Sequence, residues 1–106
     1  MAEPRRLTTF KRWRLADGVT LAHVRRVVEE AVVPHYRDLS DDVELGLEAA
    51  DDRTIIAVQR WPSRAARDAA MSGPRFEAWW QAYLPVLARW DELVSLVDEW
   101  ETEVLL

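Results

Sequence analysis

The chain has 106 residues, of which 49% are hydrophobic and 31% are charged, and its formal net charge is −5. These values predict one globular domain over residues 1–106, and the acidic balance argues against nucleic acid as a partner. The lack of cysteine excludes disulfides and thiolate chemistry, and no apolar stretch suits a signal peptide or a membrane span. We therefore expect a cytoplasmic protein that does not contact a membrane.

After a polar lead-in at residues 1–6, the first half of the chain predicts a strand, a helix and a second strand. The segment 7–15 is rich in Thr, Phe and Trp, which favour strands. Thr20 is a good N-cap for a helix, and Pro34 is expected to end that helix near residue 33. Residues 43–49 alternate between apolar and polar side chains, which predicts a strand with one buried face.

The second half predicts a strand, two helical segments and a final strand. The apolar segment 54–61 is the third strand. Ser63 caps a short helix rich in Ala and Arg, and Pro74 begins a longer aromatic helix. Pro85 is expected to kink or restart that helix. Residues 94–103 form the last strand, with apolar side chains at even spacing.

The order strand, helix, strand, strand, helix, strand predicts a ferredoxin-like α+β fold with a four-stranded antiparallel sheet. The first and last strands are neighbours in this topology. Basic residues on the first strand (Lys11, Arg12, Arg14) would face acidic residues on the last (Asp98, Glu99, Glu101, Glu103). These charges form either favourable cross-strand pairs or two solvated faces.

A set of residues around the third strand resembles a known family. Trp61 closes the strand, Ser63 turns the chain, and Pro74 and Phe76 begin the main helix. This unit resembles the second half of a dimeric α/β barrel protein of the antibiotic biosynthesis monooxygenase-like superfamily, and the order of elements matches from about residue 7 to 104. The resemblance implies a homodimer joined through the open sheet face, which two helices on one side would otherwise leave bare. The tail of the last strand at 102–106, which ends in the apolar residues 104–106, is expected to reach the partner.

Aromatic residues are the main candidates for ligand binding. Six tryptophans either fill the core and the dimer interface or line a cavity for a small aromatic molecule between the helices and the sheet. Phe76, Trp80 and Tyr83 share one helix face, and Trp61 lies just before that helix region. These four residues are the candidate cavity wall, with Trp79 as the next candidate.

The two histidines have different expected roles. His23 lies off the apolar stripe and is predicted to be a surface residue. His35 follows Pro34, where it either bonds terminal carbonyls or faces the cavity mouth with Tyr36 and acts as an acid or base. No histidine pair has helical spacing and no Gly-rich phosphate loop is present, so we expect neither a metal nor a cofactor.

The chemistry of the resembled family transfers only in part. Its haem-degrading members use an Asn on the first strand and an axial His four residues after the Phe, but this chain has no Asn and has Trp80 at that position. An indole is no substitute for an imidazole iron ligand. Many of its quinol-oxidising members carry a His nine residues after the strand-closing Trp, where this chain has Ala70.

Three hypotheses follow. The first is an oxidoreductase, a cofactor-independent monooxygenase for an aromatic or quinol-like molecule, with His35 or, second to it, Tyr36 as the base. Arg60 is a candidate to steady the substrate anion. The second is a non-catalytic ligand-binding or structural dimer, and the third is an isomerase or cyclase built on the same barrel. A cavity lined by the named aromatics would favour an enzyme or binder over a packed structural module.

Overall fold

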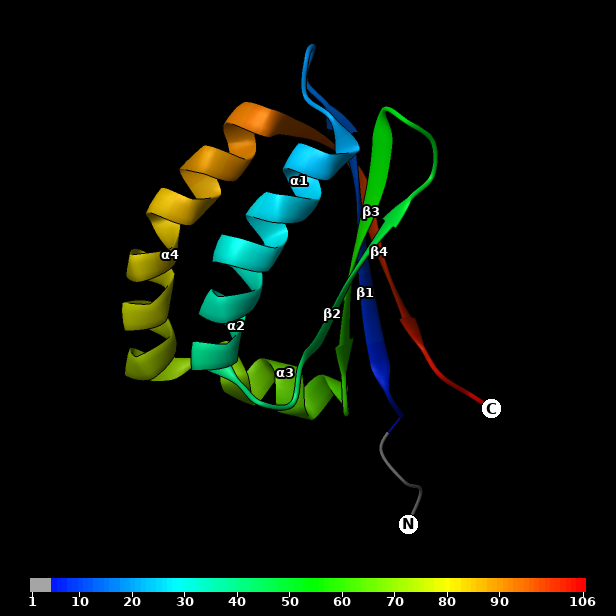
Figure 1. Ribbon diagram of the computed structural model, residues 1–106. Helices are drawn as coiled ribbons and strands as arrows, with labels where there is room; N and C mark the ends of the chain where they lie inside the picture. The colour runs from blue at the N-terminus through cyan, green and yellow to red at the C-terminus, as the bar shows by residue number, and fades with distance from the viewer. Residues whose placement is uncertain (1–4) are drawn as a thin grey trace.

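The computed structural model describes residues 5–106, which form two layers: a four-stranded sheet and helices that cover one of its faces (Figure 1). Residues 1–4 of the predicted lead-in lie outside the described part. The strands are β1 (Leu7–Leu15), β2 (Glu44–Ala49), β3 (Thr54–Trp61) and β4 (Val94–Glu103). The helical segments are α1 (Leu21–Val27), η1 (Val28–Val32), α2 (Val33–Leu39), α3 (Arg64–Ala70) and α4 (Gly73–Leu93).

The sheet has the strand order β2-β3-β1-β4, and each neighbouring pair is antiparallel. This order confirms the predicted ferredoxin-like α+β topology. The predicted bounds of the first, third and fourth strands also agree with β1, β3 and β4.

Local signals start the helices where the sequence predicts. The side-chain oxygens of Thr20 and Ser63 each accept a hydrogen bond from a backbone N–H three residues on, at 3.1 Å and 3.0 Å. Pro74 lies in the first turn of α4, where its missing N–H costs nothing. The helix then continues through Pro85 to Leu93, so it does not restart at that proline.

The prediction that Pro34 ends the first helix is wrong. A π-helical turn, η1, follows α1, and the N–H of Val33 bonds the carbonyl of Val28 five residues back. This wider turn lets a new α-helix begin at Val33 with Pro34 in its first turn, where no N–H is needed. The helical path therefore extends to Leu39 and carries His35 and Tyr36 on it.

The core lies between the sheet and the helices, as two clusters of buried side chains. One cluster joins Leu15 and Ile55 of the sheet to Val24 and Val27 of α1 and to Trp90 of α4. The second cluster contains Leu7, Leu39, Trp61, Trp79 and Tyr83. Alternate residues of β1 thus face the helices, as a pleated strand requires.

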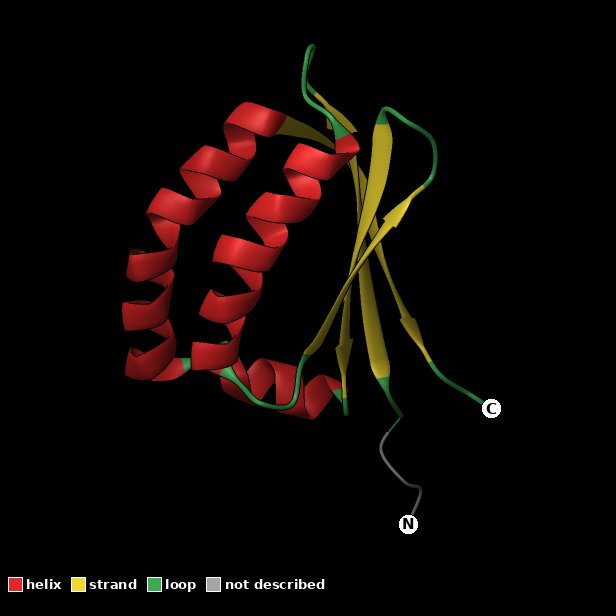
Figure 2. Ribbon diagram, in the orientation of Figure 1, coloured by secondary structure: helices red, strands yellow, loops and turns green. Residues whose placement is uncertain are grey.

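The other sheet face has no covering layer within residues 5–106 (Figure 2). There Phe10 stacks on Trp100, with ring centroids 5.1 Å apart. Arg12 lies over the Trp100 ring and pairs with Asp98 across β1 and β4 at 3.5 Å. Predicted charge pairing between these strands is confirmed at this position, although both side chains stay partly exposed. None of the helices in the described range is both long and apolar enough to cross a membrane.

Candidate functional site

Two adjoining cavities lie between the helices and the sheet. The outer cavity has a volume of about 460 Å³ and lies between β1, β4 and the start of α4. The inner cavity, of about 210 Å³, lies against β2, β3 and the middle of α4 and is walled mainly by apolar side chains. Four residues line both cavities: Lys11, Tyr36, Gln59 and Trp80.

The structure brings most of the predicted aromatic residues to these cavities. Phe76, Trp79 and Trp80 line the outer cavity, whereas Trp80 and Tyr83 line the inner one. Trp79 and Tyr83 stack with ring centroids 4.9 Å apart and are nearly buried, while Trp80 is 39% exposed. Trp61 lines neither cavity. It is 1% exposed and packs in the core behind them.

Tyr36 is placed at the site by α2. Its ring meets those of Trp79 and Tyr83 edge-on, at 5.1 Å and 5.6 Å. Its hydroxyl accepts a hydrogen bond from Gln59 Nε2 at 3.1 Å. Burial raises the pKa of the Tyr36 phenol above its ordinary value, although the bond from Gln59 opposes this. The phenol therefore keeps its proton at neutral pH.

The pKa of the Tyr83 phenol is also raised above its ordinary value. Burial raises the pKa of its phenol strongly, and the nearby Tyr36 and Asp91 add to the effect by opposing a second negative charge. Both tyrosines thus present neutral hydroxyl groups, which act as hydrogen-bonding groups and not as bases near pH 7.

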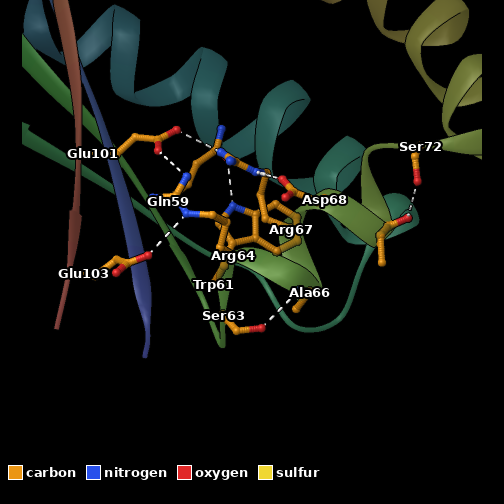
Figure 3. A network of polar contacts seen from close by, with 11 residues as sticks. Gln59, Trp61, Ser63, Arg64, Ala66, Arg67, Asp68, Ser72, Glu101 and Glu103 are labelled. Carbon is orange, nitrogen blue, oxygen red and sulfur yellow. Dashed lines mark hydrogen bonds and ion pairs between the residues drawn. The ribbon is translucent and has the colours of Figure 1, made fainter. Parts of the chain in front are cut away.

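Gln59 connects Tyr36 to the core tryptophan. Its side chain lies on the same face of β3 as Trp61, two residues on, and Trp61 Nε1 donates to Gln59 Oε1 at 3.2 Å (Figure 3). The short chain Trp61, Gln59, Tyr36 therefore runs from the buried core to the cavity wall.

His35 lies in the contact between α2 and α4. Its Nε2 is 3.3 Å from the backbone oxygen of Trp79, and Trp79 Nε1 donates to the His35 carbonyl at 2.8 Å. Its ring also stacks on Tyr83, with centroids 5.2 Å apart. His35 lines neither of the two cavities. His23, predicted to be a surface residue, is exposed on α1.

A charged network holds α3 beside the outer cavity. Arg64 and Arg67 donate to Glu101 at 2.8 Å and 3.0 Å, and Arg64 also reaches Glu103 at 3.2 Å (Figure 3). These bonds lower the pKa of the Glu101 carboxyl below its ordinary value. Arg67 and Glu101 line the outer cavity, so the network forms part of its mouth.

Sequence reasoning did not identify Lys11, Gln59 or Trp13 as site residues. Lys11 is the single lysine of the chain and lies at the middle of β1. Trp13 lines the inner cavity, and its indole Nε1 is buried without a hydrogen-bond partner. The available signal was strand alternation, because Lys11 and Trp13 share a face of β1, and Gln59 shares a face of β3 with Trp61.

A larger hollow of about 790 Å³ lies between α1, η1 and β2. None of the predicted site residues lines it, and its wall includes exposed charged side chains such as Arg25 and Glu29. Among residues 5–106, no cluster of three or more His, Asp or Glu side chains is arranged to hold a metal ion. The two cavities between helices and sheet therefore form the candidate site.

The fold and this site define a class of small α+β proteins with a cavity between a ferredoxin-like sheet and its helices. Neither a family model nor a curated protein matches the chain. Among solved structures, it is similar to NE2512, a protein of unknown function from Nitrosomonas europaea, with a TM-score of 0.64 and 16% identity over 99% of this chain and 94% of that one.

Two further structures resemble the chain. SnoaB, a cofactor-independent oxygenase from Streptomyces nogalater, has a TM-score of 0.61 and 15% identity, over 96% of this chain and 95% of that one. HapK from Hahella chejuensis has a TM-score of 0.59 and 21% identity, over 93% and 92%. At these identities the similarity establishes the fold, and it confirms the fold expected from the resemblance to the antibiotic biosynthesis monooxygenase-like superfamily.

Proposed function

We propose that this protein is a cofactor-independent monooxygenase that oxidises an aromatic or quinol-like small molecule bound between the helices and the sheet. The main support is the outer cavity of about 460 Å³, which has the size of a small-molecule site and is walled by Phe76, Trp79 and Trp80. SnoaB, which shares the fold, is a cofactor-independent oxygenase.

The reaction begins when the substrate loses a proton and becomes an electron-rich anion that passes an electron to O2. For an anthrone, one oxygen atom of O2 becomes the new carbonyl oxygen. The other leaves as water with the two hydrogens of the oxidised CH2 group. The protein needs only to bind, orient and deprotonate the substrate away from bulk water.

The proposed base is His35, because histidine is the side chain most often used in general acid–base catalysis. Its Nε2 lies against the Trp79 carbonyl oxygen, so Nδ1 is the nitrogen left to accept a proton. Tyr36 serves better as a donor than as a base, because burial keeps its phenol protonated. It is proposed to stabilise the negative oxygen of the substrate anion.

Oxygen uptake with a panel of anthrones and quinols tests this function. We expect uptake above the uncatalysed rate, and we expect Trp80→Ala to lower kcat/KM about tenfold or more because a stacking surface is lost. Leu84→Ala is the matched control. Leu84 lies on the same helix and is also 39% exposed, but it does not line either cavity. Equal losses in the two variants, or no uptake with any compound, would contradict the proposal.

A second candidate is a non-catalytic protein that binds the same class of molecule. The observation that favours it is the position of His35, whose ring is held between α2 and α4 and lines neither cavity. Tryptophan fluorescence separates the two candidates: quenching by the panel without oxygen uptake would support the binding protein.

A further inference from the structure

The inner cavity is lined by hydrogen-bond donors that lack protein acceptors. The ammonium group of Lys11, an exposed residue, only donates. The indole Nε1 of Trp13 also only donates, but it is buried behind the cavity wall without a partner. Tyr36 and Tyr83 add two phenolic hydroxyls to the same wall. A buried donor without an acceptor is costly, so such a wall favours a ligand that supplies acceptor atoms.

The hydrogen bonds of Gln59 fix the direction of the Tyr36 proton. Trp61 Nε1 has only a proton to give, so the atom 3.2 Å from it must be the Gln59 oxygen. The Gln59 amide nitrogen is then the atom next to Tyr36, and it donates to the phenol oxygen at 3.1 Å. The Tyr36 hydroxyl must direct its own proton elsewhere, and within residues 5–106 the structure gives that proton no acceptor.

The charges around the two cavities also favour a ligand with acceptor oxygens. Among the described residues that line the inner cavity, Lys11 carries the one ionised side chain, and none is a carboxylate. The acidic residues Glu99 and Glu101 line the outer cavity instead. Glu101 is already paired there with Arg64 and Arg67. A negatively charged or carbonyl oxygen therefore meets donors and the Lys11 cation in the inner cavity, while Glu99, the cross-strand partner of Lys11, lines the outer cavity.

We propose that Gln59 is a positioning residue that directs the Tyr36 proton into the inner cavity. There Tyr36 and Lys11 together bind an oxyanion or carbonyl oxygen on an aromatic ligand. This rests on the ligand site of the proposed function, but it does not require that the ligand be oxidised. It defines the ligand class as planar aromatic molecules with acceptor oxygens, and it excludes those that carry only N–H donors.

Two probes of similar three-ring shape separate these classes. Alizarin, a dihydroxyanthraquinone, carries acceptor oxygens and does not consume O2 as a quinol does, whereas 2-aminoanthracene carries N–H donors and no oxygen. Titration calorimetry of the full chain is expected to show that alizarin binds about tenfold or more tightly than 2-aminoanthracene.

Gln59→Glu is the decisive variant. A carboxylate at this position still accepts the hydrogen bond from Trp61 Nε1. Its second oxygen, however, accepts the Tyr36 proton, so that a lone pair of the Tyr36 oxygen faces the inner cavity. We expect the preference for alizarin to disappear. Gln81→Glu is the matched control, because Gln81 is the other glutamine of the chain, is exposed on α4, and lines neither cavity. It should leave the preference unchanged.

Tyr36→Phe provides a second test that keeps the ring packing against Trp79 and Tyr83. It should also remove most of the preference, and circular dichroism checks that each variant folds. If the Tyr36 proton played no part in binding, Tyr36→Phe would leave the preference for alizarin unchanged, and this result would overturn the assignment. Equal affinity of the wild-type protein for both probes, or no binding of alizarin, would also overturn it.

The binding experiment tests the donor site, and the oxidation experiment tests the monooxygenase, so one proposal can be wrong while the other holds. A probe preference that depends on Gln59, without oxygen uptake from any anthrone or quinol, would support the donor site and contradict the monooxygenase. Oxygen uptake without any probe preference would do the reverse.

Discussion

At the residue scale, Trp61 supports both the core and the candidate site. Its side chain is 1% exposed, packs beside Leu7 and Leu39, and donates to Gln59. Trp61→Phe leaves a void and removes the donor to the Gln59 oxygen. We expect a loss of about 2–3 kcal/mol in the free energy of unfolding, measured by urea denaturation.

Trp80→Phe is the control for that substitution, because Trp80 is a partly exposed tryptophan on α4. It should change the free energy of unfolding by about 0.5 kcal/mol or less. A similar small change for Trp61→Phe would show that the buried indole contributes little to the core.

The sequence identified the rings at this site but not the polar atoms between them. Helical spacing predicts that Phe76, Trp80 and Tyr83 share a face, and all three line a cavity. Gln59 looks like an ordinary polar strand residue until β3 is placed opposite α2. Its hydrogen bond joins residues 23 positions apart in the chain, and no local pattern encodes such a pairing.

At the element scale, the arginine–glutamate network fastens α3 to the end of β4. Glu101→Gln weakens the contacts to Arg64 and Arg67, which are partly exposed. We expect the Tm at pH 7 to fall by about 3 °C, the size of effect given by weak surface pairs in a chain of this length. Differential scanning calorimetry measures this change.

The effect should depend on pH in a defined direction. The two arginines lower the Glu101 pKa in the folded state, so the contact stabilises the fold above the unfolded pKa of about 4.3 and is lost as pH falls through the folded value. The Tm difference from wild type should be largest near neutrality and should shrink in acid, as the pH falls below the unfolded pKa and through the lowered folded pKa of Glu101. Glu77→Gln, at an exposed carboxylate on α4, is the control. A difference that persists unchanged in acid would contradict the ionic origin.

The end of the first helix could not be predicted from the sequence pattern around Pro34. A proline normally ends an α-helix because it lacks an N–H and its ring clashes with the preceding turn. Pro34 does interrupt the α-helical pattern, but the π turn η1 absorbs the interruption and α2 follows directly. Such a turn depends on packing of α2 against α4, through contacts such as His35 with Trp79, which lie 44 residues apart.

At the scale of the whole molecule, the sheet face opposite the helices has no covering layer within residues 5–106. It carries the stacked Phe10 and Trp100, and Ile56 lies on the same face across from Arg12. The tail beyond β4 is apolar and exposed at Leu105 and Leu106. Aromatic and apolar side chains on an uncovered sheet favour association, and a second copy of the chain offers a self-complementary cover.

We therefore propose a homodimer joined face to face through the sheets, and Ile56→Glu tests it. A charge enclosed between two sheets loses its hydration, a cost that pairing with the neighbouring Arg12 does not offset, so the variant should be a monomer where the wild type has twice the chain mass by light scattering. Leu84→Glu places the same charge on the helical side and should leave the dimer intact. A wild-type monomer would contradict the proposed dimer. A dimer that tolerates Glu at position 56 but not at 84 would place the interface on the helical layer instead of the sheet.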